Sequence, residues 1–492
     1  MAIQIASQPD KWSSAYRPIE FVFGSDRYPN TTLGDVNVPI LFIQENTVGV
    51  FATISAQFLT SDLQAGETIF IDNTDAGLYQ GNYKVRSAFE SSGVLIAYLD
   101  TAYVGDDTGG TASRVLDNFR LMAEVVFDGS GNTVEFELLP NEDDEFILNM
   151  QDCASAQFRR LFDVVEPGLA FGTLRNCDTS IAQAYTVNVW EQHTLWTSGV
   201  PSTTTNRKDT EQKLKGFRVV NAVHPYHKSE DFDMDWDSDM GDLFPIGEGQ
   251  PQRRFLTWAD RATQEVEAGD DFFVSFLVNK IAESGWQLIA TSFYEGVAFG
   301  IQTQVLGSFP QYAATINVGP SVLTALSGAD SYTIRLLDRN GVQISETLTI
   351  KYVCKSAEVS KRVYWLNKLG GLDQYTMKGR EMDIPNVGRE SISRIHNPIP
   401  TPRYQGGWNE RGSRVDAERA KLLTSENINV ATLRWLAEDC FESHDHATQV
   451  RAGWWTPMVV TGTQSTPFGT DNQNGRFLLE YHYGVDNLSQ RG

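Results

Sequence analysis

Short runs of apolar and β-branched residues, each ended by a turn sequence, recur along most of this chain. Between residues 16 and 114 the turn sequences GSDRYPN, QAG, NTDAG and ESSG separate the runs IEFVF, VPILFI, GVFATISAQF, ETIFID, YKVRSAF and VLIAYLD. Short strands bounded by Gly, Asn, Asp, Pro and Ser are typical of antiparallel β domains. The pattern predicts a small β-barrel or sandwich at the N-terminus, which the loop at residues 106–110 closes.

Two later regions repeat this pattern. The first, from residue 117, holds FRLMAEVVFD, TVEFELLP and EFILNM, and the second, from residue 271, holds DDFFVSFLVN, WQLIATSFY, SYTIRLLD and ISETLTIKYV. In the second region Asn340 and Gly341 tolerate the positive φ of a tight turn, so we expect a hairpin there. The hairpin would place these apolar residues on one face: Tyr332, Ile334, Leu336, Ile344, Leu348 and Ile350.

The last hundred residues show a different sequence pattern. The segment ATLRWLAEDCF has the spacing of one helix face, and Asn429 can cap its start. The residues expected on that face are Leu433, Leu436, Ala437, Cys440 and Phe441. Two closing strands, GWWTPMVV and RFLLEYHYGV, are expected after the helix.

A chain of 492 residues exceeds the size at which one hydrophobic core keeps growing, so several domains are expected. The predicted fold is mainly β and multi-domain, with an N-terminal small β-barrel, two β-sandwich-like domains and a small C-terminal α+β domain. The boundaries are 1–116 for the barrel, 117–225 for the first sandwich, 226–270 for an acidic irregular insertion, 271–395 for the second sandwich and 396–492 for the C-terminal domain.

The net charge of -23 constrains the partners. It would repel a phosphate backbone and an anionic membrane, so no nucleic acid is expected as a partner. No apolar stretch approaches eighteen residues, and the N-terminus lacks a basic and apolar leader. We therefore expect synthesis in the cytoplasm and no insertion into a membrane. Four distant cysteines predict reduced, buried thiols: Cys153, Cys177, Cys354 and Cys440.

No motif with catalytic mechanics occurs: GxSxG, GxxxxGK[ST], HExxH and GxGxxG after a strand are all missing. The sequence therefore predicts no enzyme. Paired carboxylates for glycoside hydrolysis stay open, because acidic residues are too common here to count as a signal.

The acidic run at residues 230–242 is the one constellation that suggests a metal. Alternate carboxylates of an extended chain project to one side, and oxygen ligands suit Ca²⁺. The EF-hand pattern fails, because Met240 stands where glycine is needed. We favour a solvated or partner-facing loop and predict no cofactor, with Ca²⁺ as the alternative at Asp233, Asp235, Asp237 and Asp239.

Histidines and tryptophans offer two further alternatives. His444 and His446, with Glu442 and Asp439 nearby, could bind a transition metal, but their place after a helix favours interaction with its dipole. Exposed tryptophans can stack on sugar rings, but tryptophan is more often packed in a core or an interface. The candidates are Trp190, Trp196, Trp236, Trp454 and Trp455.

The segment at residues 362–378, RVYWLNKLGGLDQYTMK, follows Val353-Cys354-Lys355. It resembles a pattern of virion proteins of tailed phages and prophages of Bacteroidetes hosts, in which a strand ending in cysteine leads to an aromatic–Leu-Asn–Gly-Gly stretch. Residues 254–257, RFLT, and residues 12–18 before the barrel fit the same resemblance.

The resemblance implies a structural virion protein of a tail or baseplate ring, made and assembled in the host cytoplasm. Its partners would be its own copies and neighbouring tail proteins. An indole anchor and a tight glycine turn suit either an interface or a domain-closing turn within one subunit. The candidate interface residues are Trp365, Leu366, Asn367, Gly370 and Gly371. The alternatives are a receptor-binding or head/tail fibre protein that recognises a surface glycan, and a glycan-degrading tail enzyme.

Overall fold

The structure is a computed structural model, and it describes most of the chain. The described residues are 3–25, 38–45, 51–56, 63–91, 94–115, 117–128, 130–159, 161–197, 200–205, 211–222, 244–248, 251–257, 264–278, 285–307, 312–324, 328–353, 360–393, 410–443, 445–451, 454–467 and 474–483.

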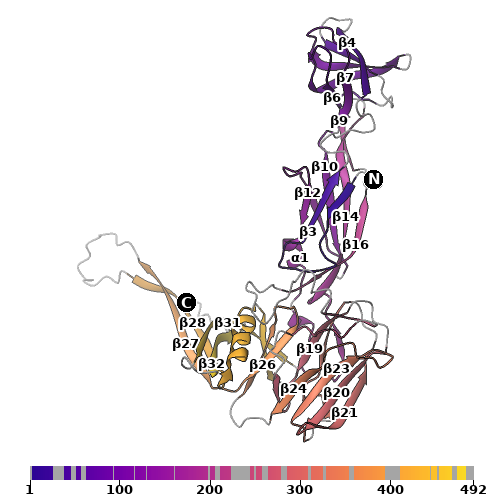
Figure 1. Cartoon of the computed structure of the whole chain (residues 1–492). Helices are drawn as coiled ribbons and strands as arrows, with labels where there is room; N and C mark the ends of the chain where they lie inside the picture. The colour runs from indigo at the N-terminus through magenta and orange to yellow at the C-terminus, as the bar shows by residue number, and fades with distance from the viewer. Residues whose placement is uncertain are drawn as a thin grey trace, which may run out of the picture. The chain divides into compact units, whose positions relative to one another are not determined.

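The fold is mainly β, as the sequence predicts, and the chain divides into two compact units (Figure 1). Unit 1 comprises Met1–Lys11, Pro18–Cys153 and Ala184–Phe217; unit 2 comprises Trp12–Arg17, Ala154–Gln183 and Arg218–Gly492. Among the described residues, no helix is long and apolar enough to cross a membrane.

A closed barrel forms part of unit 1 and confirms the predicted N-terminal barrel. Its strands, in order around the barrel, are β4 (Val38–Glu45), β5 (Phe51–Ala56), β8 (Val94–Ala102), β7 (Gly81–Ser91), β6 (Thr68–Asp72) and β9 (Thr111–Val115). Pairing of Val38 with Ala112 closes the circle, and the interior is apolar. The predicted loop at 106–110 packs tightly there, because a Cβ on Gly110 would lie 2.4 Å from the backbone oxygen of Asp72.

The rest of unit 1 is a sandwich of two sheets. One sheet has the order β11 (Thr133–Leu138), β10 (Arg120–Phe127), β14 (Ala182–Thr197) and β16 (Gln212–Val220), with β15 (Val200–Thr205) beside β14. The other has the order β1 (Ile3–Ser7), β3 (Glu20–Ser25) and β12 (Phe146–Asn149). Phe21 of β3 packs on Tyr185 and Phe217 of the first sheet. The run IEFVF therefore belongs to this sandwich and not to the barrel.

Unit 2 holds a second sandwich. A five-stranded sheet has the order β18 (Gln264–Glu267), β24 (Leu348–Val353), β23 (Ser331–Leu337), β20 (Gln287–Tyr294) and β21 (Val297–Val305). A four-stranded sheet has the order β13 (Leu174–Asn176), β22 (Ala313–Asn317), β19 (Phe273–Val278) and β17 (Pro245–Ile246). The predicted hairpin is confirmed: Gly341 has φ 80°, Tyr332 pairs with Ile350, and all six expected apolar residues are buried in one core.

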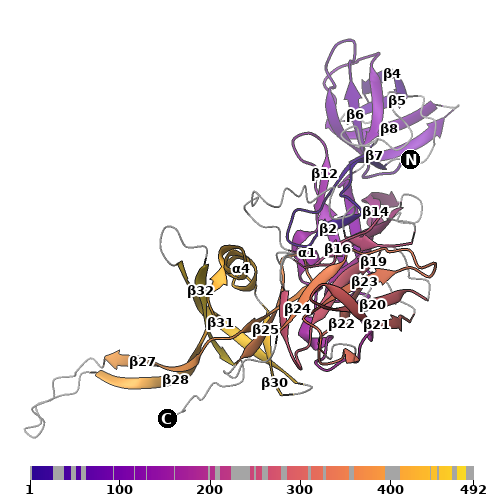
Figure 2. The ribbon, with the colours of Figure 1, turned by 60° about the horizontal axis from the view of Figure 1, so that its bottom comes forward.

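An eight-stranded sheet lies at the C-terminal end of unit 2 (Figure 2). Its order is β26 (Leu372–Met377), β25 (Lys361–Leu366), β30 (His446–Arg451), β31 (Trp454–Pro467), β32 (Asn474–Tyr483), β28 (Glu410–Thr424) and β27 (Glu381–Ser393), with β29 (Ile428–Asn429) beside β32. The two predicted closing strands are β31 and β32. The predicted boundary at 395/396 falls inside this sheet, because β25 pairs with β30, far along the sequence.

The predicted helix is present as α4 (Val430–Trp435), and Asn429 caps it by accepting a 2.7 Å hydrogen bond from the N–H of Thr432. A π-helical turn, η3 (Leu436–Cys440), follows directly. The expectation that Phe441 is buried is wrong, because its side chain is 41% exposed. The N–H of Phe441 donates to the carbonyl of Leu436, and this wider turn rotates the following residues out of the α-helical pattern.

The remaining short elements connect these sheets. They are β2 (Trp12–Ser14), which pairs in parallel with the end of β16, α1 (Gln151–Ser155) and η1 (Leu161–Asp163). Cys177 and Cys440 are free, buried thiols as predicted, whereas Cys153 is only partly buried and Cys354 lies outside the described residues.

Candidate functional site

The predicted interface segment forms the turn between β25 and β26. Asn367 organises it: Oδ1 accepts hydrogen bonds from the N–H groups of Leu369 (3.0 Å) and Gly371 (2.9 Å), and Nδ2 donates to the carbonyl of Leu256 (2.9 Å). Gly370 has φ 83°, where side chains are strained, and a Cβ on Gly371 would lie 2.2 Å from the carbonyl oxygen of Leu256. The glycines are therefore required by a close backbone approach within unit 2.

Trp365 and Leu366 also make their contacts within unit 2. Trp365 is fully buried, and its ring centroid lies 5.2 Å from that of Trp435. Leu366 is 6% exposed and belongs to the core beneath β19 and β22. These contacts explain the segment as a domain-closing turn within unit 2. The interface role that the sequence suggests for them stays a prediction.

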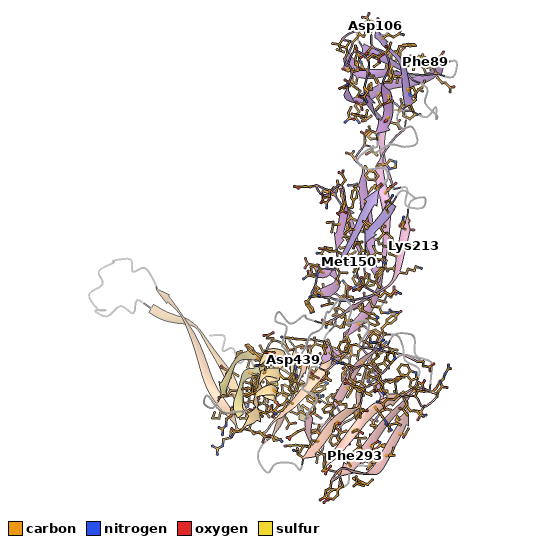
Figure 3. The ribbon with its side chains drawn as sticks, in the orientation of Figure 1. Phe89, Asp106, Met150, Lys213, Phe293 and Asp439 are labelled. Carbon is orange, nitrogen blue, oxygen red and sulfur yellow. The ribbon has the colours of Figure 1, made fainter. Side chains whose placement is uncertain are left out.

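Asp439 is a buried carboxylate close to this turn (Figure 3). Its Oδ2 accepts a hydrogen bond from the indole Nε1 of Trp365 (2.8 Å), and its Oδ1 accepts one from the N–H of Lys368 (2.9 Å). Burial, and then the nearby buried carboxylate of Asp373, raise the pKa of Asp439 to about 7. The same burial raises the pKa of the neighbouring Cys440 thiol.

The residues considered for a metal site around His446 have other bonding partners in the structure. The Nε2 of His446 is hydrogen-bonded to the carbonyl of Cys440, and Glu442 forms an ion pair of 2.7 Å with Lys368. His444 lies outside the described residues. Over the described part of the chain, no group of three or more His, Cys, Asp and Glu side chains is arranged to hold a metal ion. The acidic run, with Asp233, Asp235, Asp237 and Asp239, also lies outside the described residues.

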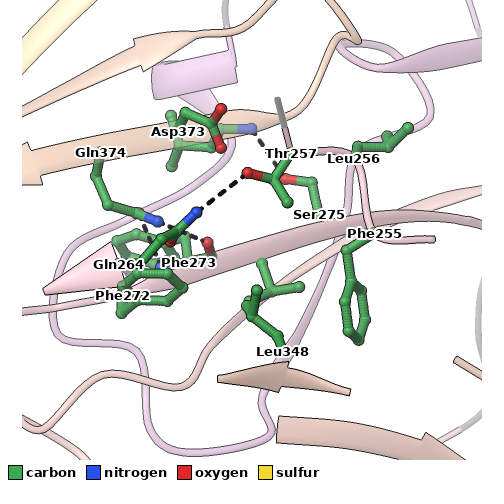
Figure 4. A pocket seen from close by; sticks show the side chains of 12 residues that line it. Phe255, Leu256, Thr257, Gln264, Phe272, Phe273, Ser275, Leu348, Asp373 and Gln374 are labelled. Carbon is green, nitrogen blue, oxygen red and sulfur yellow. Dashed lines mark hydrogen bonds between the residues drawn. The ribbon is translucent and has the colours of Figure 1, made fainter. Parts of the chain in front are cut away.

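A small pocket lies beside the turn, between β18, β19, β24 and β26 (Figure 4). Its polar groups bond to one another: Gln264 Nε2 donates to Thr257 Oγ1 (3.3 Å), and Gln374 bonds both backbone groups of Phe273. The buried Asp373 also lines it. The space inside it is about 10 Å³, which is roughly the room that one ordered water needs, so this pocket suits a water molecule better than a substrate.

The tryptophans considered for sugar stacking are packed where the structure describes their side chains. Trp190 is 3% exposed, so the favoured prediction of core packing is confirmed for it and the sugar-stacking alternative is wrong. Trp455 is partly buried; its indole N–H donates to the carbonyl of Val165 (2.7 Å), and its ring meets Tyr364. The side chains of Trp196, Trp236 and Trp454 lie outside the described ones.

Sequence reasoning missed the strand β21, VAFGIQTQV, which forms an edge of the five-stranded sheet. Its exposed residues include Phe299 at 50%, Ile301 at 69% and Val305 at 58%. The sequence carried one signal, because Gly296 closely follows the predicted run WQLIATSFY. In the structure Glu295 and Gly296 have φ 47° and 79° and form a two-residue turn between β20 and β21. Unlike the buried turn, this strand presents apolar side chains to solvent.

No protein-family model matches the chain, and no curated protein matches it. Among solved structures, the full extracellular region of plexin A4 shows 9% sequence identity and a TM-score of 0.16. The match covers 90% of this chain and 49% of that chain, so this chain spans about half of the plexin's length. A similarity this low carries no argument about fold or function.

Proposed function

We propose that this chain is a structural component of a tailed-phage virion, a tail or baseplate protein that acts by assembling with its own copies in a ring and with neighbouring tail proteins. The resemblance at residues 362–378 suggested this role. The observation that carries the proposal is a long two-stranded ribbon in unit 2, formed by β27 and β28.

The ribbon extends beyond the rest of its sheet (Figures 1 and 2). β27 and β28 pair from Glu381 opposite Leu423 to Ser393 opposite Glu410. β28 also pairs with β32, but only through Lys421–Thr424. Between residues 384 and 420, the described strands of the ribbon therefore have only each other as sheet partners.

A ribbon of two strands is marginally stable in water, because it has no third strand and no sheet face to bury. Its outer backbone groups also remain available for pairing with another chain. A neighbouring subunit that covers the ribbon would supply both missing contacts. Projecting ribbons of this kind therefore suit a protein that becomes fully ordered in an assembly.

The test compares the whole chain with a variant that lacks the outer ribbon. Asn386 and Glu418 are cross-strand partners, so residues 387–417 can be replaced by a two-glycine turn. Native mass spectrometry and negative-stain imaging of the whole chain should show rings of defined copy number. The shortened variant should keep its melting temperature and lose the ring.

Two outcomes would count against the proposal. A whole chain that stays monomeric at every accessible concentration would exclude a ring of its own copies. A monomer or slender trimer that binds host polysaccharide would instead favour the glycan-recognising fibre. If the shortened variant still formed rings, the ribbon would not be the contact, and the proposal would lose its support.

A further inference from the structure

The strand β21 is an open edge. The strand order ends β23-β20-β21, so β21 pairs with β20 on one side and with no described strand on the other. Natural edge strands are usually protected by charged residues, proline, a bulge or a covering segment. β21 contains no charged residue and no proline. A bulge interrupts its register between Phe293 and Ser292 of β20, which leaves residues 300–305 regular and unprotected.

The backbone groups that face the open edge can be assigned. The N–H of Leu306 donates to the carbonyl of Trp286 on the β20 side (2.8 Å). Since successive residues of a strand direct their backbone groups to opposite sides, Gln304 and Gln302 also bond to β20. The N–H and C=O groups of Ile301, Thr303 and Val305 therefore point to the open edge, where the carbonyl of Val305 also accepts a hydrogen bond from Nε2 of the neighbouring Gln304 (3.1 Å).

The side chains of the same residues form an apolar surface. Ile301 and Val305 are exposed on the outer face of the sheet, where Ile289 of β20 lies beside them. On the opposite face, the side chain of Gln302 accepts a hydrogen bond from the N–H of Thr324 (3.0 Å). β21 thus combines edge-facing backbone groups that have no strand partner among the described residues with uncovered apolar side chains, and a further strand satisfies both.

The lack of charge on β21 fits a second copy as its occupant. The chain carries a net charge of -23, so two copies repel one another over most of their surfaces. β21 is an uncharged strip on such a chain, and it lets two copies approach without opposing like charges. A basic or acidic partner would gain no ion pair from this strand.

We propose that β21 pairs with β21 of a second copy in antiparallel orientation, about a two-fold axis at Thr303. Thr303 then faces its own counterpart, and Ile301 faces Val305 of the other copy, so the two five-stranded sheets join into one. An axis at Ile301 would oppose Thr303 to Phe299, which lies in the bulge. The inference rests on the proposed assembly from its own copies, and it adds a two-fold contact that is independent of the ribbon.

Proline substitutions test the direction of the backbone groups. Thr303→Pro removes an N–H that faces the open edge, which edge strands tolerate. It should halve the mass of the particle measured by light scattering and leave the melting temperature unchanged. The matched control, Gln302→Pro, removes a bond to β20 and should lower the melting temperature. If Thr303→Pro also destabilises the fold, Ile301→Lys at an exposed side chain should still halve the mass.

A cysteine scan tests the axis. Thr303→Cys should give a disulfide-linked dimer on mild oxidation, because the two residues face one another. Ile289→Cys, on the same face but one strand further from the axis, should not. An unchanged mass for both Thr303→Pro and Ile301→Lys, or equal cross-linking at both cysteine positions, would overturn the inference. Rings that persist in these variants but vanish without the ribbon would leave the proposed function standing.

Discussion

The indole Nε1 of Trp365 donates a hydrogen bond of 2.8 Å to Oδ2 of Asp439, and neither side chain is more than 1% exposed. The bond joins β25 to the π-helical turn η3, which are 74 residues apart in sequence. A buried carboxylate without a cation at its oxygens is costly when charged. This pair therefore makes the stability of unit 2 sensitive to pH.

Asp439→Asn should remove much of that sensitivity. Burial and Asp373 raise the pKa of Asp439 to about 7, whereas a free aspartate has a pKa of about 4. The protonated form is favoured in the folded chain, so this group contributes stability below pH 4 that is lost as the pH rises through 7. Urea unfolding, followed by tryptophan fluorescence at pH 5 and pH 8, should show a smaller fall for Asp439→Asn than for the wild type. The exposed Glu442→Gln is the control and should keep the wild-type fall.

Asp107 in the barrel should make stability depend on pH in the opposite direction, because its pKa is lowered. Burial disfavours its charge, but hydrogen bonds from the N–H groups of Ala76, Leu78 and Thr108 outweigh that cost and lower its pKa. Its contribution to stability is present above the pKa of a free aspartate and is lost as the pH falls through the lowered pKa. Asp107→Ala should lower the melting temperature more at pH 7 than at pH 2, where the N–H groups left without an acceptor still cost stability but the charge of the carboxylate no longer contributes. Equal destabilisation at both values would contradict this assignment.

Gly371→Ala should destabilise unit 2, because the added Cβ would lie 2.2 Å from the carbonyl oxygen of Leu256. Overpacking of a tight site costs roughly 1–3 kcal/mol of unfolding free energy. The matched control is Gly307→Ala, whose Cβ would meet no atom within 4 Å. Chemical denaturation of both variants measures the difference. Similar midpoints for the two would show that the turn can move away from Leu256.

Asp338→Ala should weaken the hairpin between β23 and β24. Its Oδ1 accepts hydrogen bonds of 2.8 Å from the N–H groups of Asn340 and Val342. Loss of a buried acceptor that leaves donors unpaired costs about 1–3 kcal/mol. Arg339→Ala removes a partly exposed ion pair with Glu248 and should change the unfolding free energy by less than about 0.5 kcal/mol. Hydrogen exchange at β24 would separate the two variants.

Local chemistry explains which predictions succeeded. The turn at Asn340-Gly341, the cap at Asn429 and the alternation of β23 depend on residues a few positions apart, so the sequence predicts them well. The burial of Phe441 was mispredicted, because the widening of one turn to η3 is not encoded in the apolar spacing. β21 was missed because its apolar residues are interrupted by Gly and Gln and face solvent.

The candidate site also combines features that the sequence predicts with features that only the folded structure shows. The sequence singled out Trp365, Asn367 and Gly371 as unusual, but it left open whether they meet a neighbour or their own chain. Their partners Asp439 and Leu256 are more than seventy residues away, so only the folded structure could reveal them. The pairing of β25 with β30 is equally distant, and it places residues 361–377 in the C-terminal sheet.

The sequence by itself determined the β class, the N-terminal barrel, the hairpin turn and the start of the C-terminal helix, because turn geometry and side-chain alternation act over a few residues. The tertiary structure decided the burial of Asp439 and the open edge at β21. Both depend on which distant segments exclude water from a side chain or leave a strand without a neighbour, and such long-range pairings leave no local pattern.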